Sequence, residues 1–212
     1  MNNNTFRERL RLQLLEALPG ERSHQKMSPL NRPLTSEALK NLTNYRESAV
    51  AIVLFEADNC IECVLTQRPE YDGTHSGQVS FPGGKKEDHD TDLEETARRE
   101  CREEIGVQLT TKDLIGALSP VYIPVSQFLV LPYVYFLHSA PNYQADAHEV
   151  AEIFTFPLFD LKNEALISSM ELKLPNGTIY RNVPYFQLNN KKVWGATALM
   201  LSEMKDILSS VD

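Results

Sequence analysis

An acidic helix that follows a glycine turn is the feature that most constrains the fold of this chain. Its apolar residues recur every four positions: Leu93, Ala97, Cys101 and Ile105. This spacing predicts a helix over residues 91–105 with one side facing a core. At about 100° per residue, Glu104 returns to about 20° from Leu93, inside the apolar stripe. A buried carboxylate is costly unless it is paired or bound to a cation, so Glu104 needs a partner.

Two more carboxylates lie near Glu104 on the predicted helix. Glu100 lies on the edge of the apolar stripe and Glu103 just beyond it. Carboxylates at i, i+3 and i+4 can converge on one point and repel each other there. Hard divalent cations such as Mg²⁺ bind this kind of oxygen cluster. Glutamate runs on helices are more often solvated faces, but the place of Glu104 in the stripe favours a metal site.

The ends of this helix are marked in the sequence. Thr91 and Glu94 are spaced as a capping box, and Gly106 is a stop signal. The expected solvated side carries four charged residues: Glu95, Arg98, Arg99 and Arg102. Residues 81–84 before the helix read as a turn, in which Gly83 and Gly84 allow the backbone to approach a ligand and turn a carbonyl inward.

Residues 84–107 resemble the Nudix box, the loop-helix-loop signature of Nudix hydrolases. The matching positions are Gly84, Arg99, Glu100, Cys101, Glu103, Glu104, Gly106 and Val107. The gap from Gly84 to Arg99 is one residue longer than the common pattern, and Asp90 stands where a glutamate is usual. The longer spacing is familiar in the coenzyme A diphosphatase branch. The resemblance implies an α+β chain with the Nudix α/β/α sandwich, a mixed β-sheet between helices.

The resemblance also implies roles for the residues of the box. Glu100 and Glu104 would be metal ligands for Mg²⁺ or Mn²⁺, and Glu103 a further ligand or the base that orients water. Gly84 would offer its carbonyl oxygen to the metal. Arg99 lies four residues before Glu103, so it can pair with Glu103 and hold its orientation. We therefore expect Arg99, Glu100 and Glu103 to be catalytic.

The segment upstream of the box is similar to the extra motif of coenzyme A-cleaving Nudix enzymes. It runs from Leu65 to Gly84 and contains the candidate substrate-binding residues Arg68, His75 and Gln78. Gly73 stands where a second arginine is usual, and arginine suits phosphate recognition. Residues 183–186 and 193–198 are similar to a closing segment of the same branch, in which we expect Trp194 to anchor the last helix to the core.

A catalytic base can also come from outside the box, as in several Nudix enzymes. Glu149 and Glu152 precede the expected strand 153–156 and are candidates for this base, while ordinary surface charge is the alternative. Three functions remain open. The first is a coenzyme A diphosphatase, the second a Nudix diphosphatase for another nucleoside diphosphate derivative such as ADP-ribose or NADH, and the third a non-catalytic Nudix binding module.

The composition limits the kinds of molecule that this chain is expected to bind. The 212 residues carry a formal net charge of -8, which argues against binding of long nucleic acid through a basic surface. A small phosphorylated substrate is compatible, since a bound metal inverts the local sign of charge. We find no secretory signal or membrane-spanning stretch, and the 3 cysteines favour a reduced, cytoplasmic location. Cys60 and Cys63 read as plain strand cysteines. A homodimer is expected by analogy alone.

The remaining pattern is mixed α and β. Residues 5–18 read as an amphipathic helix packed on its own domain, with a membrane-surface helix as the alternative. Residues 20–43 read as a partly ordered connection. We therefore divide the chain into residues 1–45, a helix and a connection, and residues 46–212, the Nudix domain.

The expected strands are 49–55, 60–67, 114–119, 128–138, 152–157, 170–174 and 178–181. The last two are joined by a hairpin turn at Asn176 and Gly177. Residues 194–208 are expected to form the last helix.

Overall fold

Strand β1 (Arg46–Ala57) is buried on both faces and organises the fold. Ala49, Ala51 and Val53 belong to one hydrophobic cluster, while Ile52 and Leu54 belong to another. Strands buried on both faces need a layer of structure on each side. The computed structural model describes residues 3–29, 32–40, 42, 44–58, 60–70, 77–173, 177 and 179–211.

The main sheet has eight strands and is mixed. Strand β1 pairs antiparallel with β2 (Cys60–Gln67) and β4 (Gly83–Lys85), and parallel with β7 (Phe128–Leu137). Strands β3 (Val79–Ser80) and β8 (Glu152–Pro157) pair with β2. Strands β5 (Leu114–Ala117) and β6 (Val121–Ile123) pair with β7.

A second, three-stranded antiparallel sheet follows the main one along the chain. It consists of β9 (Ile167–Lys173), β10 (Ile179–Leu188) and β11 (Lys191–Trp194). The pairing of β9 with β10 confirms the expected hairpin, although Asn176 lies outside the described residues. The sequence pattern did not separate these strands from the main sheet.

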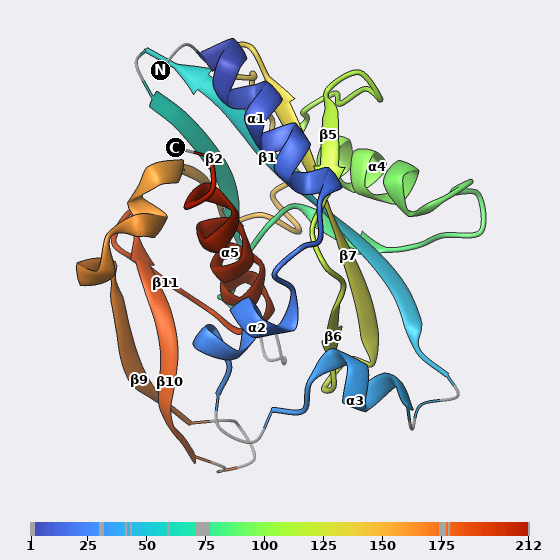
Figure 1. Ribbon diagram of the computed structural model, residues 1–212. Helices are drawn as coiled ribbons and strands as arrows, with labels where there is room; N and C mark the ends of the chain where they lie inside the picture. The colour runs from blue at the N-terminus through green and yellow to red at the C-terminus, as the bar shows by residue number, and fades with distance from the viewer. Residues whose placement is uncertain are drawn as a thin grey trace.

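Helices cover both faces of the main sheet. Figure 1 shows α1 (Asn3–Leu15) and α5 (Gly195–Leu208) on one side, and α4 (Leu93–Ile105) on the other. The two hydrophobic clusters agree with this arrangement, because α4 supplies Ala97, Cys101 and Ile105 to one of them and α5 supplies Leu201 and Met204 to the other. The expected α/β/α sandwich with a mixed sheet is confirmed.

Helix α1 packs on its own domain, as expected. Phe6, Leu10 and Leu14 are buried in the same cluster as Phe136 of β7. The helix ends at Leu15 and not at residue 18. The ring of Pro19 would clash with the carbonyl of Leu15, four residues earlier, in a continued helix. Within the described residues, no helix is both long and apolar enough to span a bilayer.

Residues 20–43, expected to be a partly ordered connection, contain short helical elements that the sequence pattern did not identify. This segment holds α2 (Glu21–His24), a 3-10 turn at Gln25–Met27 and α3 (Thr35–Lys40). The elements are too short for a periodic apolar pattern. Polar contacts to α5 hold the first of them instead: His24 Nε2 lies 3.0 Å from the Glu203 carboxylate, and Ser202 donates to the carbonyl of Ser23.

Helix α4 begins two residues later than expected. Its N-cap is Asp92, whose carboxylate accepts from the amide of Glu95 at 2.8 Å. Glu95 in turn accepts from the amide and the hydroxyl of Thr91. The predicted capping box of Thr91 with Glu94 is therefore wrong by one residue, because Asp92 is an equally good cap. Gly106 ends the helix in the left-handed conformation, with φ of 73°.

Strands β2 and β8 have the predicted bounds, whereas β3, β4, β6 and β11 were missed. Each missed strand has two to four residues, too few for an alternating pattern. The predicted turn at 81–84 is corrected accordingly, since Gly83 and Gly84 begin β4. Trp194 precedes α5 as its N-cap and is half-buried, while Val193 beside it reaches the core. Trp194 is thus not the main anchor of that helix.

Candidate metal and hydrolase site

A buried arginine joins the loop before α4 to the helix itself. Arg99 is 7% exposed, and its Nε and Nη2 donate to the two oxygens of Asp90, each at 2.9 Å. This bidentate pairing holds the pKa of the Asp90 carboxyl well below its usual range. The expectation of Arg99 on the solvated side of the helix is wrong, because the loop carrying Asp90 folds back over that side.

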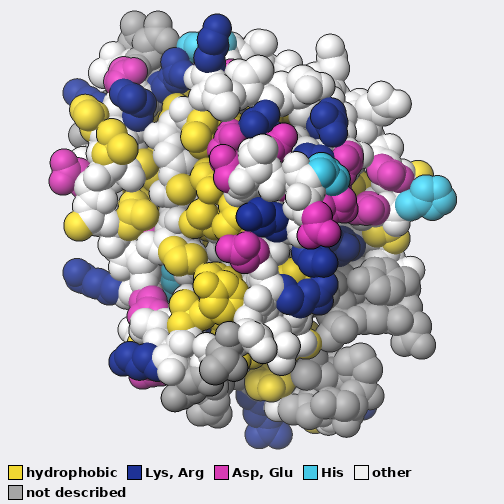
Figure 2. All heavy atoms as spheres, turned by 90° about the vertical axis from the view of Figure 1, so that its right-hand side faces the viewer, with side chains coloured by type: hydrophobic (Ala, Val, Ile, Leu, Met, Phe, Trp, Pro, Cys, Tyr) yellow, Lys and Arg dark blue, Asp and Glu magenta, His cyan; other side chains and the backbone are white. Residues whose placement is uncertain are grey.

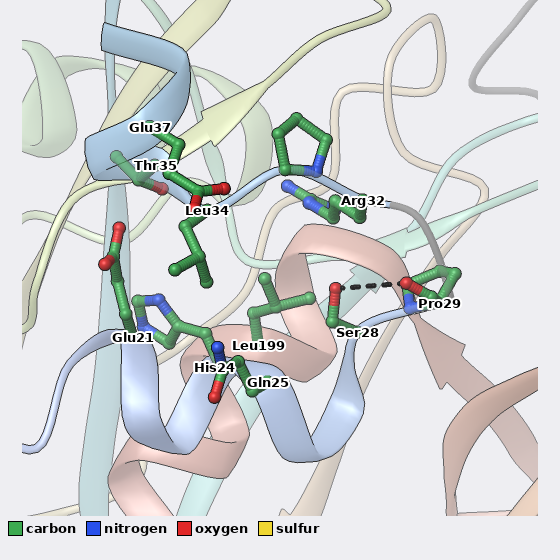
Figure 3. Close-up of a pocket in the computed structure, with 11 residues that line it drawn as sticks. Glu21, His24, Gln25, Ser28, Pro29, Arg32, Leu34, Thr35, Glu37 and Leu199 are labelled. Carbon is green, nitrogen blue, oxygen red and sulfur yellow. Dashed lines mark hydrogen bonds between the residues drawn. The ribbon is translucent and has the colours of Figure 1, made fainter. Parts of the chain in front are cut away.

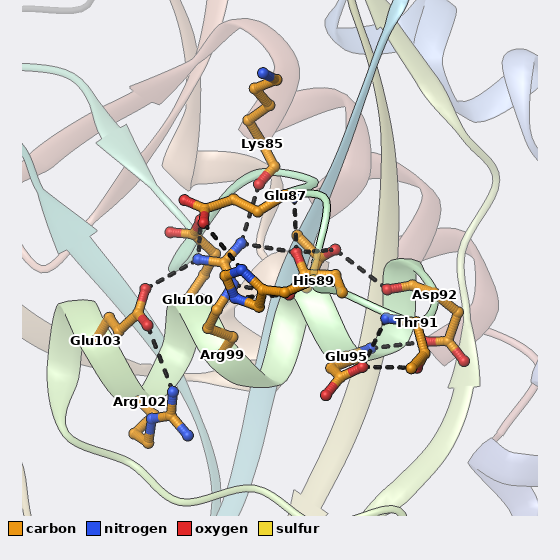
Figure 4. Close-up of polar contacts among 12 residues, drawn as sticks. Lys85, Glu87, His89, Thr91, Asp92, Glu95, Arg99, Glu100, Arg102 and Glu103 are labelled. Carbon is orange, nitrogen blue, oxygen red and sulfur yellow. Dashed lines mark hydrogen bonds and ion pairs between the residues drawn. The ribbon is translucent and has the colours of Figure 1, made fainter.

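Arg99 also organises two of the glutamates. Its Nη1 donates to Glu100 at 2.8 Å and to Glu103 at 2.9 Å, and its Nη2 donates to the carbonyl oxygen of Lys85 at 3.0 Å. Figure 4 shows these contacts converging on one guanidinium. All five N–H groups of Arg99 therefore have acceptors within the protein.

Glu104 is buried, as its place in the apolar stripe predicted. Its side chain meets two donors: the amide of Gly83 at 3.3 Å and the Nη2 of Arg68 at 3.7 Å. Burial raises the pKa of Glu104 to about 8 and outweighs the Arg68 charge, which lowers it. Burial also raises the pKa of Glu100. Both carboxyls thus lie where a negative charge is poorly solvated.

Three carboxylates from two parts of the chain meet at this point. Glu100, Glu104 and Glu149 each offer an oxygen, and these oxygens lie within 4.8 Å of one another. Such a set suits a hard divalent cation such as Mg²⁺ or Mn²⁺, which prefers oxygen ligands and would relieve the repulsion. The residues therefore fit a metal centre with Glu149 in the position expected for Glu103.

The other predicted site residues are placed differently. Glu103 lies outside this carboxylate cluster, and its oxygens contact Arg99 and Arg102. Glu152 accepts a 2.7 Å hydrogen bond from Lys191 on β11. Arg68 lies beside Glu104, and the carbonyl of Gln78 accepts from the amide of Arg68. His75 lies outside the described residues.

Two glycines allow β4 to lie close to its neighbours, Gly84 against α4 and Gly83 against β1. A Cβ on Gly84 would lie 2.5 Å from the Glu100 carboxyl carbon, and one on Gly83 would lie 2.4 Å from the carbonyl oxygen of Ala49. The carbonyl of Gly84, expected as a metal ligand, accepts from the hydroxyl of Ser48 at 2.6 Å. The second lone pair of that oxygen is still available to a cation.

The loop at residues 144–150 was missed as a part of the site. The amide of Gln144 donates to the carbonyl of Ile105, and the amide of Asp146 to that of Glu104, both at 2.9 Å. These bonds satisfy carbonyls at the end of α4 and bring Glu149 to the cluster. No sequence signal marks Gln144 or Asp146, because their backbone groups make the contacts.

The face that carries α4 shows mixed charge. Figure 2 shows acidic and basic side chains gathered there beside an apolar stretch. This grouping agrees with the ion pairs of the helix, in which Arg98 pairs with Glu94 at 2.9 Å and Arg102 with Glu103 at 3.4 Å. The carboxylates of the cluster thus have cationic neighbours on the same side of the molecule.

Comparison with known proteins agrees with the fold. A family model of the NUDIX domain matches residues 45–174. A protein of Yersinia enterocolitica named uncharacterized Nudix hydrolase NudL is 32% identical over 143 residues, covering 66% of this chain and 71% of that protein. Its namesake in an Enterobacter species is 30% identical over 165 residues, covering 78% and 84%. The crystal structure of a MutT protein from Methanosarcina mazei shares the fold, with a TM-score of 0.53 and 19% identity over 80% of this chain and 99% of that one.

The sandwich fold and the acidic helix define an enzyme class, hydrolases that act on nucleoside diphosphate derivatives. The domain match covers more than half of the chain, and the Yersinia protein exceeds 30% identity over more than two thirds of its own length. The chain therefore belongs to the Nudix hydrolase family.

Proposed function

We propose that this Nudix hydrolase cleaves the diphosphate bond of coenzyme A or an acyl-coenzyme A in a reaction that depends on Mg²⁺ or Mn²⁺. The products would be 4′-phosphopantetheine, or its acylated form, and adenosine 3′,5′-bisphosphate. The observation that carries the hydrolytic part is the meeting of Glu100, Glu104 and Glu149 within 4.8 Å. A bound divalent ion would neutralise the diphosphate and lower the pKa of the attacking water.

The protein groups have separate tasks in this proposal. Glu100 and Glu104 hold the ion, because they are the less exposed carboxylates of the cluster and their charges are poorly solvated. Glu149 comes from an exposed loop position and is our candidate for the base that orients water. Glu103 remains an alternative as ligand or base, although its carboxylate already contacts Arg99 and Arg102. Arg99 acts through the orientation of Glu100 and Glu103.

The preference for coenzyme A rests on the segment upstream of the box. It places Arg68 at the end of β2, with its guanidinium 3.7 Å from Glu104. An arginine beside the metal ligands can contact a diphosphate oxygen when the substrate binds. Gly73, which replaces a second arginine, favours the alternative of ADP-ribose or NADH as substrate. A binding module is the least favoured alternative, because all four charged residues of the box are present.

The deciding experiment compares coenzyme A, acetyl-coenzyme A, ADP-ribose and NADH with Mg²⁺ or Mn²⁺ and with chelator, and identifies the products by mass. We expect the coenzyme A compounds to be cleaved fastest and chelator to abolish the reaction. Preference for ADP-ribose or NADH would overturn the substrate and keep the metal site. Absence of any turnover, with measurable nucleotide binding, would favour the binding module.

Three further proposals follow the same reading. Residues 1–45 would be an addition packed on the hydrolase domain of 46–212, because Phe6 and Leu10 share a hydrophobic cluster with Phe136.

A reduced compartment such as the cytoplasm is supported by the free thiols of Cys60 and Cys63. Homodimer formation rests on analogy and is tested by light scattering of the purified protein.

A further inference from the structure

A pocket lies away from the carboxylate cluster. It has a volume of about 350 Å³, lies between α2, α3 and α5, and shares no lining residue with the cluster of Glu100, Glu104 and Glu149. This volume is within the range of small-ligand sites. In Figure 3, Arg32, Leu34 and Glu37 lie on the side formed by α3 and the segment before it, and Ser28 and Leu199 lie opposite.

Arg32 brings a cation to this pocket without an acidic partner. The side chain is half-buried, and its Nη2 donates to the carbonyl oxygen of Tyr122 at 2.7 Å. Among the described residues, no carboxylate oxygen lies within ion-pair distance of its guanidinium. Burial lowers the pKa of Arg32, in line with the absence of an ion pair among the described residues. An anion in the pocket would supply the missing partner.

A carboxylate without a cation lines the same pocket. Glu37 is exposed on α3, and no described side chain forms an ion pair with it. Glu21, the other acidic lining residue, is already engaged, since its oxygens accept from the amide of Ser36 at 2.5 Å and from the hydroxyl of Ser36 at 2.8 Å. The lining therefore carries one cation, Arg32, and two carboxylates, and among the described residues no ion pair joins Arg32 to either of them.

The rest of the lining is mixed, with four polar and four apolar residues. Leu34 and Leu199 face each other across the pocket in Figure 3, and Pro29 and Pro33 add to the same lining. Leu199 is 4% exposed and belongs to the hydrophobic core, so this wall is fixed by α5. Apolar walls with a few placed charges are typical of small-molecule sites, in which the charges set orientation and specificity.

We propose that this pocket is a binding site for a small zwitterion, an amino acid with an aliphatic side chain. Its carboxylate would pair with the guanidinium of Arg32 and its ammonium with the carboxylate of Glu37. Its aliphatic side chain would lie between Leu34 and Leu199. A zwitterion can pair with Arg32 and Glu37 at once, whereas a simple anion would leave Glu37 unpaired and be repelled by Glu37 and Glu21.

The test uses the full chain with chelator present, so that the carboxylate cluster holds no metal. L-leucine is titrated while amide NMR shifts are recorded, beside 4-methylpentanoate, which lacks the ammonium group, and 3-methylbutylamine, which lacks the carboxylate. We expect leucine to bind at least about tenfold more tightly than either analogue, because each loses a charge-assisted contact. The shifts should concentrate at residues 28–37 and at Leu199.

Two variants with matched controls test whether Arg32 and Glu37 bind the charged groups of leucine. Arg32→Gln should weaken leucine binding by at least about tenfold, while Arg22→Gln, an exposed arginine on α2, should leave it unchanged. Since Arg32 also supports Tyr122, Glu37→Gln provides a second variant at an exposed position. It should weaken leucine binding and leave that of 4-methylpentanoate no weaker, while Glu16→Gln serves as its control.

Three outcomes would overturn the proposal. The first is the absence of saturable shifts with leucine. The second is equal binding of leucine and 4-methylpentanoate, which would show that the ammonium group is not recognised. The third is binding that both Arg32→Gln and Glu37→Gln leave unchanged. None of these outcomes bears on the hydrolase activity, which is measured separately with metal.

Discussion

The backbone amide of Asp146 donates a hydrogen bond of 2.9 Å to the carbonyl oxygen of Glu104. This bond links the backbone of Glu104, a proposed metal ligand on α4, to the loop that carries Glu149. The Asp146 side chain shapes the same loop, because its Oδ1 accepts from the amide of His148 at 2.8 Å. The loop conformation and the spacing of the carboxylates are therefore coupled.

The first prediction concerns this loop. Asp146→Ala removes the acceptor for His148 and should raise the Mg²⁺ concentration for half-maximal hydrolysis about tenfold, the usual effect of losing a group that orients a metal ligand. Asp146→Asn keeps an acceptor oxygen and should restore most of the metal affinity. Asp113→Ala is the control, since Asp113 accepts from Thr110 in a similar turn elsewhere. Equal metal dependence of Asp146→Ala and wild type would contradict the role.

The second prediction concerns Glu104 and pH. The folded-state pKa of about 8 lies above the ordinary 4.5, so the folded protein holds this proton more tightly than the unfolded chain. Its contribution to stability is complete below about pH 4.5 and is lost as pH rises through about 8. With chelator, Tm of the wild type should therefore fall relative to Tm of Glu104→Gln between about pH 5 and 9.

Metal should reverse this difference. Mg²⁺ stabilises the ionised carboxylates, so its addition at pH 8 should raise Tm of the wild type more than Tm of Glu104→Gln. The same variant should lose at least about 10²-fold of its hydrolytic rate, as expected for the loss of a charged group that acts in the transition state. A parallel pH dependence of the two Tm values would show that Glu104 does not titrate in this range.

The third prediction concerns the pairing of Asp90 with Arg99. Asp90→Asn removes one of the three carboxylates that pair with Arg99 and leaves Glu100 and Glu103, so it should lower the free energy of unfolding by about 1.5–3 kcal/mol in urea denaturation. Asp88→Asn, an exposed acid in the same loop, should change it by less than about 0.5 kcal/mol. If both variants unfold at the same urea concentration, the Asp90 pairing does not stabilise the box.

The fourth prediction concerns Gly84. Its φ is not in the left-handed region, so alanine can adopt the backbone, but the new Cβ would lie 2.5 Å from the Glu100 carboxyl carbon. Glu100 must move, and a displaced ligand should lower kcat/KM about 10²-fold. Tm with chelator should change little, because the end of a flexible side chain gives way. A wild-type value of kcat/KM in Gly84→Ala would show that Glu100 can move away from the new Cβ without loss of activity.

Much of the helix and sheet could be predicted because local pattern determined it. The four-residue apolar repeat predicted α4 and the burial of Glu104, and the strand signals of residues 60–67 and 152–157 predicted β2 and β8 with their bounds. The pairing of Arg99 with Glu103 followed from their spacing on the helix. In these cases the residues that decide the structure are neighbours in sequence.

The parts that could not be predicted depend on contacts between distant segments. The burial of Arg99 results from a loop that folds back with Asp90. The placement of Glu149 beside Glu104 results from backbone hydrogen bonds at the end of α4, and backbone groups carry no residue signal. Helix α2 is held by the carboxylate of Glu203 on α5, from the opposite end of the chain.

The parallel pairing of β1 with β7 has a consequence for folding. Its register runs from Arg46 with Phe128 to Phe55 with Leu137, so the pairing closes a long loop formed by the chain between the two strands. Such non-local pairing is slow because loop entropy is lost before the contacts form. The loop that carries Glu149 follows β7 in the chain, so an early β1–β2 hairpin cannot yet present the three carboxylates. We therefore expect the affinity for divalent ions to appear late in refolding, after most secondary structure has formed.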